Sequence, residues 1–152
     1  MHAEELARPY PTVGLDTDAA EAVRSLTERE RPALIVVDEL DHPVAVLPAS
    51  QVLRGAIPRY VQDDPALARV IDESFADQMT AWLAGKTVAD LMPTKRTPLP
   101  VVAPDDTVLE IAAVMAANRC PLVAVVEDGP DGPRFLGAVS AGELVARALP
   151  RV

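Results

Sequence analysis

Cysteine, histidine and aromatic residues are scarce in this chain of 152 residues. Cys120 is the one cysteine, so no intramolecular disulfide can form and an oxidising compartment is not implied. His2 and His42 stand apart in the sequence and offer no spacing typical of a zinc site. Aromatic residues make up only 3% of the chain, so its core must consist mainly of Val, Leu, Ala and Ile, which the 49% hydrophobic content can supply.

Positive charge and long apolar runs are also lacking. The formal net charge of -9 argues against binding of duplex nucleic acid, because contacts to phosphate require clustered Lys and Arg. No apolar stretch reaches the ~20 residues of a membrane span, and the acidic N-terminal stretch MHAEELARPYP is not a signal peptide. We therefore expect a cytoplasmic protein that does not insert into a membrane.

The sequence contains an internal repeat. Residues 13–37 align without a gap on residues 102–126, and residues 45–54 align on residues 138–147. Between the two aligned blocks, the second copy carries extra residues in the turn EDGPDGP. Each copy is predicted to run helix, strand, strand, helix, since short β-branched runs follow a segment with helical spacing. One such unit exposes an apolar sheet face that a second copy can bury, which gives a physical reason for the duplication.

Acidic residues stand where helices are expected to begin. We predict that Asp16 caps the first helix of one copy, and that Asp105 or Asp106 caps the corresponding helix of the other. The pair Asp63–Asp64 stands before another predicted helix and is interpreted in the same way. Helix capping therefore explains these paired acids better than catalysis does.

A long amphipathic helix is predicted between the copies, over residues 63–86. Asp64 followed by Pro65 is typical of a helix start, and Gly85 can end the helix. Its apolar side chains recur every four residues and include Phe75 and Trp82. This face either packs against its own domain or forms a surface for self-association.

The stretch FLGAVSAGELV places Ser140 and Glu143 where a strand leads into a helix. Three interpretations exist: a nucleophile, a helix cap and a contact to a small polar ligand. The stretch AVSAG nearly matches the nucleophile elbow G-x-S-x-G, but no histidine follows Ser140, so hydrolase chemistry is disfavoured. Phosphate-binding loops of the G-x-x-x-x-G-K-[ST] and G-x-G-x-x-G types are missing too. Cys120, before a proline and an apolar strand, is expected to be a small buried side chain.

The order VADLMP, PVVAPDDTVLEIAAVM, CPLVAVV and FLGAVSAGELV resembles the cystathionine-β-synthase (CBS) domain. Two copies in tandem, with no catalytic domain attached, resemble a stand-alone CBS-pair protein, the Bateman module. The resemblance implies an α+β fold of two β-α-β-β-α repeats packed through their sheets. We expect the first CBS repeat at residues 1–58, the linking amphipathic helix at 59–85 and the second CBS repeat at 86–152.

The resemblance also implies a ligand, namely AMP, ADP, ATP or another adenosyl compound. The family pattern Gly-x-x-[Ser/Thr]-x-x-Asp falls on Gly137, Ser140 and Glu143, where the hydroxyl would approach phosphate and the acid would accept hydrogen bonds from the ribose. The residues expected beside the base are Leu99, Pro100, Val101, Cys120 and Pro121. Because the net charge is negative, phosphate would need local cations, and the candidates are Lys95, Arg96 and Arg119.

Two departures from the pattern bear on this expectation. Glu143 replaces the usual Asp, and the first copy has Leu47 and Ser50 at the matching positions, so its cleft lacks both the hydroxyl and the acid. Ser140 and Glu143 also fit a capping box, S-x-x-E, and one pair of residues can serve as cap and as ligand contact.

Our interpretation is a regulatory sensor module without catalysis of its own, forming a homodimer and acting on an unidentified protein partner. No metal and no catalytic cofactor is expected. The alternative is a ligand-free CBS-pair scaffold for dimerisation or protein interaction.

Overall fold

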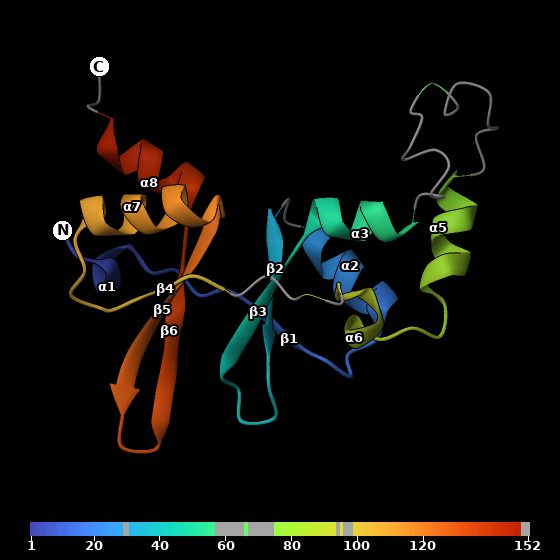
Figure 1. Cartoon of the computed structure of the whole chain (residues 1–152), viewed down its shortest axis with the longest axis horizontal. Coiled ribbons are helices and arrows are strands. Elements are labelled where there is room, and N and C mark those ends of the chain that lie inside the picture. Colours follow the sequence, from blue (N-terminus) through green and yellow to red (C-terminus); the bar gives the residue numbers. More distant parts are fainter. Residues whose placement is uncertain (29–30, 57–65, 67–74, 94, 96–98, 150–152) are drawn as a thin grey trace.

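The protein has an α+β fold of two similar units that lie side by side (Figure 1). The computed structural model describes residues 1–28, 31–56, 66, 75–93, 95 and 99–149. Each unit has a three-stranded sheet, and the turns of both hairpins lie at the same end of the molecule. Among the described residues, no helix has the length and apolar character needed to cross a bilayer.

The first unit is formed by the first copy of the repeat. Strand β1 (Thr12–Gly14) runs parallel to β2 (Ala33–Val37), and β2 pairs antiparallel with β3 (Pro43–Pro48). Helix α2 (Ala19–Glu28) connects β1 to β2, and α3 (Ala49–Ala56) follows β3. All five residues of β2 are buried, as expected for a central strand that is covered on both faces.

The second unit repeats this order. It consists of β4 (Val101–Val102), α7 (Val108–Asn118), β5 (Leu122–Gly129), β6 (Gly132–Ser140) and α8 (Ala141–Ala148), with strand order β4-β5-β6. The extra residues of the second copy lengthen the hairpin itself, whose strands β5 and β6 pair down to their last residues. The predicted duplication, and the order helix, strand, strand, helix within each copy, are confirmed.

The two sheets pack against each other. Leu34 and Val36 of β2 face the helices of the first unit, whereas Ile35 between them faces the second sheet, as the alternation of a strand requires. The cluster between the sheets takes its buried side chains from both units: Ala33, Ile35, Val37, Val46, Leu99, Cys120, Leu122, Ala124 and Ala138. The predicted packing of the repeats through their sheets is therefore confirmed.

Two short helices each pack against one unit and lead in sequence into the other unit. Helix α1 (Ala3–Leu6) lies against the second unit, where Leu6 is fully buried and the amide of Ala3 donates to the carbonyl of Asp106 at 2.8 Å. Helix α6 (Val88–Leu91) lies against the first unit, where the amide of Val88 donates to the carbonyl of Thr17 at 2.9 Å. The chain thus crosses from one unit to the other after each short helix.

Helix α5 (Phe75–Leu83) lies within the span of the predicted linking helix. Residues 57–65 and 67–74, including the predicted helix start at Asp64–Pro65, lie outside the described residues. Met79, Trp82 and Leu83 pack against the core of the first unit, and Leu83 is buried. The helix ends before Gly85, which takes the left-handed φ of 74°. For these three side chains, packing against the chain's own domain is confirmed.

Helix caps lie beyond the residues predicted for them, Asp16, Asp105 and Asp106. The hydroxyl of Thr107 caps α7 and accepts from the amide of Glu110 at 3.3 Å. Asp18 caps α2 in the same way, accepting from the amide of Glu21 at 3.1 Å. The prediction was wrong because Asp106 satisfies the preceding turn instead, where its carboxylate accepts from the amide of Ala103 at 2.9 Å.

Candidate ligand-binding site

Ser140 and Glu143 lie at the N-terminus of α8, where β6 ends. The Ser140 hydroxyl accepts from the Glu143 amide at 3.2 Å, which confirms Ser140 as the N-cap. The Glu143 carboxylate does not return to Ser140 as a closed capping box requires. Its Oε1 accepts from Nε of Arg8 at 2.9 Å. The Glu143 side chain is 23% exposed and the Arg8 side chain 58%. The acid of the predicted site is therefore paired with a residue far away in the sequence.

Arg8 lies on the segment that crosses from α1 to β1, which we call the crossing segment (residues 7–11). Its backbone exchanges two hydrogen bonds with Ala138 of β6, both 3.0 Å long. Gly137 permits this approach, because a Cβ atom there would lie 2.7 Å from the carbonyl oxygen of Arg8. The glycine of the family pattern thus positions the crossing segment next to α8.

A pocket of about 490 Å³ adjoins the crossing segment. Its lining comes from the crossing segment, α2 and the entry to β2: Pro9, Tyr10, Pro11, Ser25, Glu28 and Arg31. The Arg31 guanidinium lies over the Tyr10 ring, 5.3 Å from its centroid. The Tyr10 hydroxyl donates to the carbonyl of Ala33. Burial raises the pKa of Tyr10 above its ordinary value, against the opposing effects of Arg31 and this hydrogen bond. The pocket therefore combines an aromatic ring, an arginine and proline side chains.

Three of the residues predicted to bind the ligand lie in a groove that is separate from this pocket. Arg119, Cys120 and Pro121 line a groove of about 390 Å³ between α7 and α8. Arg119 ends α7 in the left-handed conformation, with φ of 49°. Cys120 is 7% exposed, which confirms the predicted small buried side chain. Arg119 belongs to this groove, and the pocket beside Arg8 has a different lining.

The predicted base-binding segment lies at the opposite edge of the second sheet from Ser140. Val101 belongs to the edge strand β4, and β5 separates it from β6. Leu99 is 7% exposed within the cluster between the sheets, and the carbonyl of Pro100 accepts from the amide of Ala124 at 2.9 Å. Leu99 and Pro100 are thus buried, and β5 keeps Val101 apart from Ser140.

Of the two cations predicted before this segment, one lies within the described residues. Lys95 is exposed, whereas Arg96 lies outside the described residues. The first copy differs at the matching positions as the sequence indicated, because Leu47 is fully buried in the core and Ser50 lies on α3. A buried leucine cannot take the place of the Ser140 hydroxyl.

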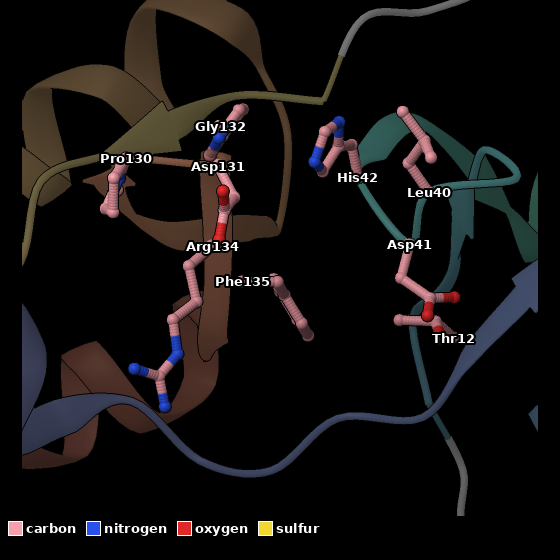
Figure 2. Close-up of a pocket in the computed structure, with 11 residues that line it drawn as sticks. Thr12, Leu40, Asp41, His42, Pro130, Asp131, Gly132, Arg134 and Phe135 are labelled. Atoms are coloured by element: carbon pink, nitrogen blue, oxygen red, sulfur yellow. The ribbon is translucent and has the colours of Figure 1, made fainter.

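A further cavity of about 570 Å³ lies between the ends of the two hairpins (Figure 2). His42 and Asp41 reach it from the first unit, and Asp131, Arg134 and Phe135 from the second. Figure 2 shows the His42 side chain turned toward Gly132, and a Cβ atom on Gly132 would lie 3.3 Å from Cε1 of His42. None of the predicted ligand-binding residues lines this cavity. Within the part of the chain that the structure describes, no three His, Cys, Asp or Glu side chains gather as a metal site.

Sequence reasoning missed Arg8, Tyr10 and Arg31. The repeat contained a signal for two of them, because Tyr10 and Arg31 align with Leu99 and Cys120 when residues 13–37 are laid on 102–126. No local pattern indicates Arg8, since its partner Glu143 is 135 residues away in the sequence.

Comparisons with known proteins agree with this architecture. The family model of the CBS domain matches residues 3–57 and 88–149. A CBS domain-containing protein of unknown function from Kribbella flavida is 55% identical with a TM-score of 0.84, and the match covers 99% of each chain. The CBS domain of a membrane protein from Sphaerobacter thermophilus is 24% identical with a TM-score of 0.70, over 99% of this chain and 90% of that one.

CBSX2, solved in complex with AMP, is 20% identical with a TM-score of 0.65, over 97% of this chain and 95% of that one. A comparison with curated proteins found no match. The family model covers more than half of the chain in two segments, and each segment contains one copy of the repeat. The chain therefore belongs to the CBS domain family, and it contains two CBS domains in tandem.

Proposed function

We propose that the protein is a non-catalytic regulatory module that binds an adenine nucleotide or a related adenosyl ligand. The observation that carries this proposal is the position of Glu143 at the N-terminus of α8, paired with Arg8, whose chain neighbour Pro9 lines the pocket of Tyr10 and Arg31. The protein that it regulates would be a separate cytoplasmic chain.

The side chains at this position match the parts of a nucleotide. A carboxylate such as that of Glu143 accepts hydrogen bonds from two neighbouring ribose hydroxyls. The Ser140 hydroxyl and the N-terminus of α8 favour a negatively charged phosphate. The Tyr10 ring and Pro9 offer flat apolar surface to a base. In this proposal the base uses the pocket of the crossing segment, and not the surface of Leu99, Pro100 and Val101.

The likeness to CBSX2 supports the choice of ligand class. That protein has the same fold and was solved with AMP. At 20% identity the likeness concerns the fold alone, so the proposal rests on the side chains of this chain.

Calorimetric titration with AMP, ADP, ATP and adenosine tests the proposal. We expect saturable binding of one nucleotide per chain, because the first copy has the buried Leu47 where the second has Ser140. Two equal sites per chain would contradict the asymmetry. If none of the four compounds bound at millimolar concentration, the ligand-binding proposal would fail.

Self-association is a second candidate function, favoured by the outer surface of α7 and α8. Leu109 is 79% exposed, Val145 55% and Leu149 63%. On the first unit, α5 covers the surface of α3, and Trp82 lies against Gly55. No described helix covers the outer surface of α7 and α8 in the same way. We propose that two copies of the protein pair through this surface.

Light scattering at tens of micromolar tests this second proposal. We expect a dimer, and we expect Val145→Lys to yield a folded monomer, because the charge would be buried without a partner. A wild-type protein that remains monomeric would contradict it. A dimer that fails to bind nucleotide would favour the ligand-free scaffold.

A further inference from the structure

The ion pair of Arg8 and Glu143 joins the carboxylate proposed for the ribose to a cation beside it. We infer that Arg8 is a phosphate-selecting residue: it releases Glu143 when a nucleotide binds and then pairs with the phosphate. The inference rests on the proposed function, and it assigns to Arg8 a discrimination between nucleotides and nucleosides.

The Glu143 carboxylate cannot pair with Arg8 and accept from both ribose hydroxyls at the same time. Its Oε1 already accepts from Nε of Arg8 at 2.9 Å, whereas two neighbouring ribose hydroxyls engage both carboxylate oxygens best. The pair is accessible to exchange, because the Arg8 side chain is 58% exposed and an ion pair at such a position contributes little stability. A bound ribose would therefore displace the guanidinium from the acid.

Arg8 would stay within reach after this displacement. Its amide and its carbonyl are both bonded to Ala138, at 3.0 Å each, so the backbone position does not depend on the ion pair. The side chain can turn about its own bonds while the crossing segment remains on β6. The neighbouring Pro9 lines the pocket, so Arg8 is the next residue in the chain to the proposed site of the base.

The other cations are less well placed for this role. Arg31 lies over the Tyr10 ring, and Arg119 lies in the groove between α7 and α8. Arg8 is the cation that contacts Glu143 directly. With a net charge of -9, a phosphate that approaches without a local cation meets an unfavourable field.

Replacement of Arg8 by alanine is expected to weaken AMP without weakening adenosine. A nucleotide gives Arg8 a phosphate in return for the lost carboxylate, and charge-assisted hydrogen bonds of this kind are strong. Adenosine displaces Arg8 and gives it nothing in return. Removing the guanidinium should therefore weaken AMP and at the same time remove a competitor of adenosine.

Titration calorimetry of AMP and adenosine tests the inference on four proteins: the wild type, Arg8→Ala, Arg8→Lys and the control Arg134→Ala. Arg134 is exposed and lies near the turn of the hairpin of β5 and β6, where it lines the cavity shown in Figure 2. In Arg8→Ala we expect AMP to bind about tenfold more weakly and adenosine to bind equally well or up to about fivefold more tightly. Arg8→Lys should retain part of the preference for AMP, and Arg134→Ala should match the wild type.

Added salt gives an independent measurement. The affinity of the wild type for AMP should fall as salt screens the ionic contact, and this dependence should be smaller in Arg8→Ala. Equal weakening of AMP and adenosine in Arg8→Ala would show that Arg8 only holds the crossing segment, and it would overturn the inference while the proposed function stands. A wild type that binds neither compound would overturn both.

Discussion

Replacement of Gly137 by alanine tests how closely the crossing segment lies on β6. The new Cβ atom would lie 2.7 Å from the carbonyl oxygen of Arg8 and 3.2 Å from Cβ of Ala7. Because real Cβ contacts to backbone oxygen are longer than 2.7 Å, the crossing segment must move outward. The movement would strain both hydrogen bonds between Arg8 and Ala138. Overpacking costs about 1–3 kcal/mol and each of the two weakened bonds up to about 1 kcal/mol, so we expect a loss of about 1–5 kcal/mol.

Urea unfolding at 25 °C measures this loss, and Gly142→Ala is the matched control. A Cβ atom on Gly142 meets nothing within 4 Å, and alanine is favoured over glycine within a helix by up to about 1 kcal/mol. Gly142→Ala should therefore raise the midpoint of unfolding, whereas Gly137→Ala should lower it. If Gly137→Ala unfolded at the wild-type midpoint, the close approach of the crossing segment would be refuted, and with it the placement of Arg8 beside Glu143.

Three further predictions concern the supports of the site. Leu6→Ala should cost about 2–5 kcal/mol and shift NMR signals of the second unit, since Leu6 is fully buried there. Shifts confined to the first unit would contradict the packing of α1 on the second unit. Trp82→Ala should cost about 2 kcal/mol in urea unfolding, because α5 would lose one of its three side-chain contacts with the core of the first unit. Hydrogen bonds from Thr107 hold the pKa of Glu110 below its ordinary value, so the stability from this carboxylate is present above its unfolded pKa and lost as the pH falls through the lower folded pKa. Glu110→Gln should therefore lower the melting temperature at pH 7 and approach the wild type below about pH 4; a difference that does not depend on pH would exclude this cause.

The repeat and the order of elements could be predicted because they depend on local patterns. Runs such as ALIVV and LVAVV have the length and the branched side chains of buried strands, and the helices before them have an apolar spacing. The packing of α1 on the second unit and of α6 on the first was harder to predict. The alignment began at Val13, yet His2–Leu6 and Thr87–Leu91 share an acid three residues after the cap and a buried leucine. A short helix has too few residues for its periodicity to show which unit it joins.

The candidate site could be predicted only where it is local. Ser140 and Glu143 stand in one short stretch, and the cap between them follows from their spacing. The partner of Glu143 could not be predicted, because Arg8 reaches it through the crossing of the chain between units. The caps of α2 and α7 were misplaced for a related reason, since one acid can satisfy a turn or a helix start and the sequence alone does not decide between them.

The two copies share a backbone arrangement but differ in the side chains at the start of their last helix and in the exposure of their helices. In the first unit, Leu47 is buried where the second has Ser140, and α5 packs over its helices. In the second unit, the N-terminus of α8 holds a polar cap and an acid, and the outer surface of α7 and α8 is apolar and exposed. The crossing segment links these surfaces to the first unit, because it runs from α1 on one core to β1 on the other. The ligand that we propose would thus lie beside a segment that joins both units.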